Sequence, residues 1–286
     1  MWIQLTQIIY HLNFHGFCVH FTAARYLIAG GIIDPAAGSS TLTEVVELVN
    51  TNSTPSFGQL PFSRIGAVGA MLGNVPIICG GIGGTWDDPH NDNLTVHDSC
   101  ISFQKSQWSR SHSMNEERFF PSGVQINSTN LWILGGLDNQ SLPMSTTEFI
   151  TQGQTNGVSG PKLPFGLATM CAVKFSEEEI FVIGGDRGIP FLPNPTNEVW
   201  IYNPQDGFSR KQGPSLNTKR RLHSCSTIRD GKKKFIIVAG GANVKAYEFP
   251  LRLPIERNLD SVEIYDPIDN IWHSGKTNSI IFIVKY

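Results

Sequence analysis

The sequence predicts an all-β protein built from five similar repeats. Five short apolar runs each end in two consecutive glycines, and successive pairs are separated by 50, 55, 49 and 56 residues. A fixed period of this length indicates an array of similar units, here of strands. The low charged fraction and the many glycines and prolines also suit an all-β protein rich in turns. The glycine pairs are Gly30–Gly31, Gly80–Gly81, Gly135–Gly136, Gly184–Gly185 and Gly240–Gly241.

The first four repeats are defined mainly by their strand-like runs. The runs before the glycines are residues 26–29, 76–79, 131–134 and 181–183. Paired glycine after a buried strand lets the backbone take positive φ and pack closely where side chains would clash. Each of these repeats has a second feature later in its sequence. It is the run 42–48 in the first, the aromatic pair Phe103 and Trp108 in the second, the run 145–149 in the third, and the run 197–202 before the turn Asn203–Pro204 in the fourth.

The fifth repeat is the most complete. Four short strands are predicted at residues 222–228, 234–239, 261–265 and 270–273. Asp230–Gly231 supplies a tight hairpin turn between the first two strands, and Asp266–Pro267 supplies the turn between the last two. Tyr265 and Trp272 flank the second turn, and such large side chains suit the space between neighbouring sheets.

Five glycine pairs in register, with Tyr265, the turn Asp266–Pro267 and Trp272 in one repeat, resemble the kelch repeat. This resemblance implies four-stranded blades of a β-propeller, with repeats at about 14–62, 63–115, 116–165, 166–217 and 218–276. A generic sandwich would not keep this period.

A propeller closes its ring of sheets, because open edges promote association. We therefore expect five recognisable blades and a six-bladed design with one blade partial; the alternative is closure by the N-terminal strand. Residues 1–13 are expected to form an irregular segment. Residues 277–286 are expected to be a C-terminal remnant or the start of a further blade.

Charge and hydropathy argue against several classes of function. The net charge is −2, and the basic clusters 219–221 and 232–234 fall at predicted turns, which disfavours nucleic-acid and membrane-surface roles. The apolar C-terminal stretch after Asn278 is too short to span a bilayer. The N-terminal residues lack a basic start followed by a long apolar stretch, so a signal peptide is not supported.

Four of the five cysteines form two candidate disulfides. Cys79 precedes Gly80, and Cys100 lies in the following strand, where antiparallel neighbours allow the Cα separation of a disulfide. Cys171 and Cys225 fall on the innermost strands of adjacent blades and could approach each other near the axis. The alternative is that these cysteines are free and act as small buried hydrophobes. The arrangement resembles that of extracellular kelch proteins with a Cys-Gly-Gly strand.

The four Asn-x-Ser/Thr sequences fall in predicted loops or hairpin turns, where a glycan can project. Together with the cysteines they favour a secreted or extracellular protein, while the missing signal peptide favours the cytoplasmic alternative. The candidate glycosylation sites are Asn52, Asn93, Asn127 and Asn139.

No catalytic or metal-binding pattern emerges. Gly-x-Ser-x-Gly, a phosphate-binding loop and His-Glu-x-x-His are all missing from the sequence. The acidic residues 87, 88 and 92 lack the spacing of a calcium loop, and the N-terminal histidines fit no single strand face. We expect no enzymatic activity, no metal and no cofactor.

The resemblance implies that partners dock on two sets of loops. One set follows each double glycine and includes Trp86, Asp88, Asp138, Arg187, Phe191, Lys245, Tyr247 and Arg252. The other joins consecutive blades and carries Arg64, Arg118 and Arg221 at equivalent positions. Arginine forks suit carboxylates of a partner peptide. The alternative is that these arginines cap local backbone carbonyls between blades.

The favoured function is a non-catalytic module that binds a protein or peptide on the loop rim of the propeller. An extracellular, disulfide-stapled domain that recognises glycan or matrix is the alternative. An enzyme resembling galactose oxidase is the third and least favoured reading.

Overall fold

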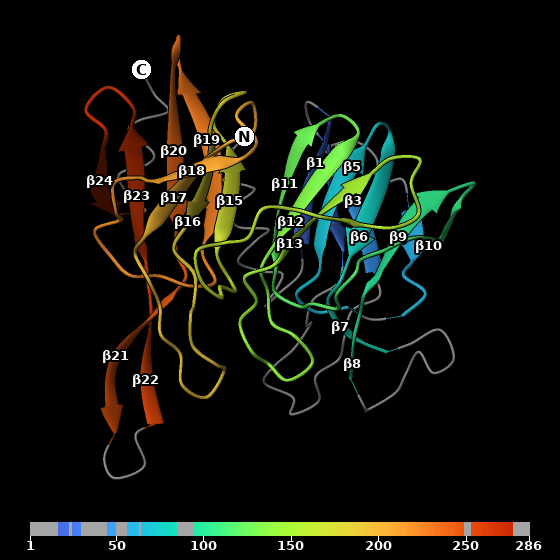
Figure 1. The fold of residues 1–286 in the computed structure, drawn as a ribbon, viewed down its shortest axis with the longest axis horizontal. Coiled ribbons are helices and arrows are strands. Elements are labelled where there is room, and N and C mark those ends of the chain that lie inside the picture. Colours follow the sequence, from blue (N-terminus) through green and yellow to red (C-terminus); the bar gives the residue numbers. More distant parts are fainter. Residues whose placement is uncertain are drawn as a thin grey trace. The chain divides into compact units, whose positions relative to one another are not determined.

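The computed structural model describes residues 17–22, 25–29, 45–49, 56–62, 64–84, 94–248 and 253–276. The described strands form five four-stranded antiparallel sheets and two small two-stranded hairpins (Figure 1). The chain divides into two compact units. The N-terminal unit is Met1–Gln140 with Thr146–Gly160, and the C-terminal unit is Ser141–Ser145 with Pro161–Tyr286. Within the described ranges, no apolar helix of membrane-spanning length occurs.

The N-terminal unit holds the first three sheets. The first contains β1 (Phe17–Thr22), β2 (Arg25–Ala29), β3 (Val45–Val49) and β4 (Ser56–Gln59). The second contains β5 (Val68–Leu72), β6 (Val75–Cys79), β9 (Ser99–Gln104) and β10 (Gln107–Ser113), with the hairpin β7 (Ile82–Gly83) and β8 (Thr95–Val96) between β6 and β9. The third contains β11 (Ser122–Asn127), β12 (Asn130–Leu134), β13 (Thr147–Thr151) and β14 (Val158–Ser159).

The C-terminal unit holds the last two sheets. The fourth contains β15 (Cys171–Lys174), β16 (Ile180–Ile183), β17 (Val199–Asn203) and β18 (Ser209–Gln212). The fifth contains β19 (Ser224–Asp230), β20 (Lys233–Ala239), β23 (Ser261–Asp266) and β24 (Ile271–Lys276). The ribbon of β21 (Ala242–Glu248) and β22 (Leu253–Asn258) extends beyond the end of this sheet (Figure 1).

The four strands of each sheet come from one stretch of about 40 to 55 residues, as expected of repeated blades. The strand β1 pairs with β2 of its own sheet. The expected partial sixth blade would begin in residues 277–286, which lie outside the described residues, as do residues 1–13.

The double glycines lie where one sheet meets the next. All eight described members of the pairs have positive φ, from 55° to 102°. A Cβ on Gly80 would lie 2.6 Å from the Arg118 carbonyl oxygen, and that oxygen accepts the Gly81 N–H at 2.8 Å. Only glycine permits both the φ value and this approach. The pair Gly30–Gly31 lies outside the described residues.

Large apolar side chains fill the space between neighbouring sheets. In the C-terminal unit, Tyr265 and Trp272 stand 5.4 Å apart between ring centroids and pack with Phe181, Val199 and other residues of the fourth sheet. The indole N–H of Trp272 donates to a backbone carbonyl at 2.8 Å. The predicted role of Tyr265 and Trp272 between sheets is therefore correct.

Candidate partner-binding site

Three buried arginines hold the double-glycine turns in place. We call Arg64, Arg118 and Arg220 the arginine clamps; each side chain is at most 1 % exposed. In each clamp, Nη1 donates to the carbonyl of the first glycine of the pair and to a carbonyl at or just before the start of the third strand of the same four-stranded sheet (β9, β13 or β23). The acceptors are Gly80 and Ser99 at 2.7 and 2.8 Å, Gly135 and Thr146 at 2.9 and 3.1 Å, and Gly240 and Ser261 at 2.8 and 3.3 Å.

Two of the clamps are neutralised by buried glutamates. Arg118 Nη2 lies 2.7 Å from Glu148 Oε1, and Arg220 Nη2 lies 2.8 Å from Glu263 Oε1. Each carboxylate also accepts a backbone N–H at 2.6 Å from the residue three before its arginine. A buried charge needs a partner and further hydrogen bonds, and both pairs have them.

Among the described residues, Arg64 has no carboxylate bonded in this way. The position that matches Glu148 is Ile101, which is fully buried. The ring of Phe62 lies 4.7 Å from the Arg64 guanidinium instead, and Ser99 Oγ accepts from Nη2 at 2.6 Å. Burial lowers the pKa of Arg64 to about 9, so this arginine remains charged at neutral pH.

These contacts correct the prediction for the inter-blade arginines. Arg64 and Arg118 are buried and cannot touch a partner, so their predicted partner-binding role is wrong and the capping alternative is right. The third equivalent residue is Arg220, whereas Arg221 matches Ile65, because both form the isolated bridge that follows the clamp. In the fourth sheet, the buried Leu167 takes the clamp position.

Arg221 joins the bases of two loops in the C-terminal unit. Its backbone exchanges two hydrogen bonds with Ala242, the first residue of β21, at 3.0 and 2.9 Å. Its Nη1 lies 3.1 Å from Asp186 Oδ2, and both side chains are largely buried. The ion pair therefore fixes the start of the β21–β22 ribbon relative to the loop that begins at Asp186.

That second loop is a tight, self-supported hairpin, here called the fourth-sheet loop (Asp186–Asn194). Asp186 Oδ1 accepts the N–H groups of Gly188 and Asn194 at 2.8 and 2.7 Å. The Leu192 N–H donates to the Ile189 carbonyl at 2.9 Å. One buried carboxylate thus fixes both arms of the loop.

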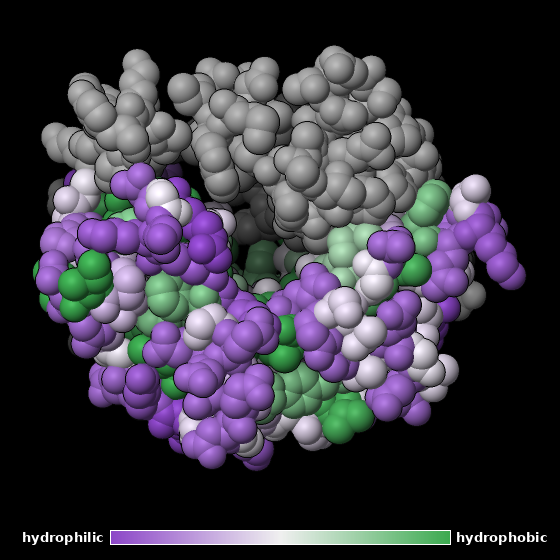
Figure 2. Space-filling model, turned by 90° about the horizontal axis from the view of Figure 1, so that it is seen from above, coloured by the Kyte–Doolittle hydropathy of each residue, from purple (hydrophilic) through white to green (hydrophobic). Residues whose placement is uncertain are grey.

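The tip of the fourth-sheet loop is apolar and exposed. Phe191 is 82 % exposed and Leu192 is 52 % exposed. On the face drawn in Figure 2, the described surface is mostly hydrophilic with small separate hydrophobic patches. The loop therefore presents two adjacent large apolar side chains to solvent at its tip.

Arg187 is anchored within the protein at the base of the loop. Its guanidinium lies 3.4 Å from the Phe165 ring centroid and 2.6 Å from Glu198 Oε2. The side chain is 30 % exposed. Most of its charge and its flat face are therefore used internally, which leaves only its edge for a partner.

The structure thus brings three predicted site residues together at the fourth-sheet loop, namely Arg187, Phe191 and Arg221. Tyr247 lies near the far end of β21, where it pairs with Pro254, and its side chain is outside the described part. Trp86, Asp88 and Arg252 lie outside the described residues. The sequence pattern does not predict the role of Asp186, although Asp followed two residues later by Gly is a turn signal.

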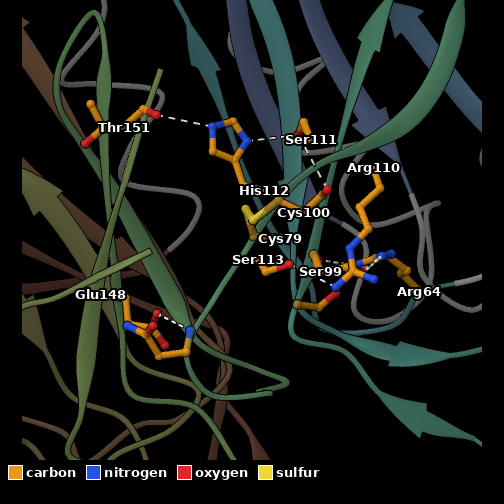
Figure 3. The surroundings of a disulfide bond; sticks show 12 residues. Arg64, Cys79, Ser99, Cys100, Arg110, Ser111, His112, Ser113, Glu148 and Thr151 are labelled. Atoms are coloured by element: carbon orange, nitrogen blue, oxygen red, sulfur yellow. Dashed lines mark hydrogen bonds between the residues drawn. A yellow bond between two sulfur atoms is a disulfide. The ribbon is translucent and has the colours of Figure 1, made fainter. Parts of the chain in front are cut away.

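Both predicted cysteine pairs are bonded. Cys79 in β6 and Cys100 in β9 face each other with a Cα–Cα distance of 4.0 Å, and both are fully buried. In Figure 3, this bond lies between the Arg64 clamp and the side chain of His112. Cys171 and Cys225 join β15 to β19, with a Cα–Cα distance of 5.9 Å.

Two buried histidines lie next to the clamps. Burial, and secondarily the charge of Arg64, lowers the pKa of His97 to about 3. Burial, and secondarily Arg220, lowers the pKa of His223 to about 3. Both imidazoles are therefore neutral at physiological pH.

One group of metal-ligand type stands at the β23–β24 turn. Ligand atoms of Asp266, Asp269 and His273 lie within 4.8 Å of one another. The sequence does not reveal this group, because Asp266 has the pattern of a turn residue. Asp269 and His273 are exposed, and nothing else at the turn points to an ion.

Comparisons with known proteins agree with this architecture. A family model of the kelch motif matches residues 168–207, which run from the start of the fourth sheet to the turn after β17. A solved structure, titled "Structure of YjhT", superposes with a TM-score of 0.72, covering 91 % of this chain and 83 % of that chain at 12 % identity. No curated protein matches the sequence. The fold is that of an all-β propeller. Residues 168–207 carry a kelch motif within this fold.

Proposed function

We propose that this chain is a non-catalytic protein-interaction module whose partner docks on the fourth-sheet loop. The observation that carries the proposal is the exposed Phe191 at the tip of a loop fixed by Asp186. Aromatic side chains are enriched among the residues that dominate binding energy. Because the loop is already ordered, binding loses little conformational entropy there.

The chemistry of the loop favours apolar contact over recognition of an acidic peptide. Arg221 is paired with Asp186, and Arg187 is paired with Glu198. These arginines therefore offer little uncompensated charge, whereas Phe191 and Leu192 offer exposed apolar surface. The partner that suits this tip is a folded protein with an apolar pocket that receives the Phe191 ring.

The test places a photoreactive phenylalanine analogue at position 191 and, as a control, at Ile268. Ile268 is also apolar and 67 % exposed, and lies on the β23–β24 turn. The protein cross-linked through position 191 is then purified, and its affinity is measured by calorimetry. We expect Phe191→Ala to weaken binding by about tenfold or more and Ile268→Ala to leave it unchanged. Equal cross-linking at both positions, or unchanged affinity of Phe191→Ala, would refute the proposal.

A second inference concerns the compartment, because two disulfides favour an oxidising environment. The module then works outside the cytosol, where a protein, glycan or matrix component is the available partner. Non-reducing peptide mapping of protein from its native source tests this inference. The expected result is two linked cysteine pairs. Free thiols at all four positions would instead indicate a cytosolic protein.

A further inference from the structure

The hairpin between β11 and β12 carries the sequence Asn127-Ser128-Thr129 at its turn. The residues of the turn are all exposed. Asn127 Oδ1 accepts hydrogen bonds from the Thr129 N–H at 2.9 Å and from the Thr129 hydroxyl at 3.0 Å. This contact joins the two residues that define an Asn-x-Ser/Thr acceptor. Asn127 Nδ2 makes no hydrogen bond to the part of the chain that the structure describes.

The backbone of this turn is fixed independently of the Asn127 side chain. The Ser128 carbonyl accepts the Gly73 N–H at 2.5 Å, and the Thr129 carbonyl accepts the Gln152 N–H at 2.8 Å. A large group attached to Asn127 Nδ2 would extend into solvent and would break none of these contacts. The hairpin therefore tolerates a glycan at no cost to the fold.

Asn139, the other acceptor in the described part of the chain, differs. Its Nδ2 donates to Glu117 Oε1 at 2.5 Å. A glycan on Asn139 would replace this hydrogen bond. The two acceptor sequences are similar, but their amide nitrogens differ in the structure. Asn139 Nδ2 donates a hydrogen bond to Glu117, whereas Asn127 Nδ2 donates none to the described residues.

We propose that Asn127 carries an N-linked glycan in the mature protein and that Asn139 does not. The two disulfides favour an oxidising compartment for the folded chain, which is where this modification occurs in secreted proteins. In the transfer, Asn127 Nδ2 bonds to the anomeric carbon of an oligosaccharide. The bond from that carbon to a lipid pyrophosphate breaks, and the amide loses one proton. The inference does not depend on partner docking at the fourth-sheet loop.

The first test is site-resolved mass spectrometry of the full chain from its native source, after release of N-glycans by an amidase in heavy-oxygen water. Conversion of Asn127 to labelled aspartate supports the proposal. An unmodified Asn127, or a glycan on Asn139 in place of Asn127, overturns it.

The second test uses variants of the full chain produced through the secretory pathway of eukaryotic cells. Asn127→Gln and Thr129→Ala should each lose one glycan, whereas Thr129→Ser should keep it. The matched control Asn139→Gln should migrate like the parent protein. Thermal unfolding of each variant after glycan removal shows whether a lost glycan reflects misfolding. If the parent protein and the Asn127→Gln variant carry the same number of glycans, the assignment is wrong.

Discussion

Acid should destabilise this propeller through two particular histidines, His97 and His223. Both are buried, and each has a pKa of about 3 in the folded protein. In the unfolded chain the ordinary pKa is about 6.5. Between these values the unfolded state binds more protons, so the stability contributed by the neutral imidazoles is complete above about pH 6.5 and is lost as the pH falls.

The size of the effect follows from these values. At pH 5, which is about 1.5 pH units below the pKa in the unfolded chain, the unfolded histidine is protonated and the folded one stays neutral. Each pH unit of this difference corresponds to about 1.4 kcal/mol. Each histidine should therefore reduce the free energy of unfolding by about 2 kcal/mol between pH 7.5 and pH 5, and the two together by about 4 kcal/mol. That loss is a large fraction of the stability of a typical domain.

Urea unfolding at the two pH values measures the effect. The His97→Gln/His223→Gln variant removes both titrating groups but keeps a polar side chain at each position. Its loss of stability on acidification should be smaller than that of the parent by about 4 kcal/mol. The reasoning fails if parent and variant lose the same free energy, because other groups would then be responsible.

Three further perturbations test the scaffold. Glu148→Gln leaves the buried Arg118 charge with only the half-exposed carboxylate of Glu116, and urea unfolding should show a loss of about 3 kcal/mol. A loss below about 1 kcal/mol would mean that Glu148 contributes little to holding the arginine. Gly184→Ala places a Cβ 2.8 Å from the Arg220 carbonyl oxygen at a φ of +56°. It should therefore lower the melting temperature well beyond the effect of Gly207→Ala, whose Cβ meets nothing within 4 Å. Replacing both Cys171 and Cys225 by serine removes a cross-link between residues 54 positions apart, and the free energy of unfolding should fall by about 4 kcal/mol because the unfolded chain gains entropy. Unchanged stability would show that this disulfide does not stabilise the fold.

The repeat architecture could be predicted because its signals are local. Each double glycine directly follows a short apolar run, so the period alone predicts five sheets. The pairing of Cys79 with Cys100 could be proposed for the same reason, since both positions are fixed by the strands that carry them. These features depend on the order of residues along one repeat.

The orientation of the arginines could not be predicted in the same way. Arg220 and Arg221 are adjacent, and one is a buried clamp while the other links two loops. Both lie in a connection between sheets, where no strand period indicates which side chain points inward. The distinction depends on a glutamate more than 40 residues later, Glu263, which only the folded sheet brings next to Arg220.

The fourth sheet departs from the clamp pattern at the place where we propose binding. Its clamp position is Leu167, and its arginine, Arg187, comes instead from the fourth-sheet loop and pairs with Glu198. In the second, third and fifth sheets the buried arginine binds the double-glycine turn. Here the arginine supports the base of a loop whose tip exposes Phe191. Departures from a repeated structural rule tend to mark functional positions. If the loop were only scaffold, Leu167→Arg with Arg187→Leu would restore the common pattern without loss of partner binding. We expect the reverse, namely a folded protein whose fourth-sheet loop no longer binds its partner.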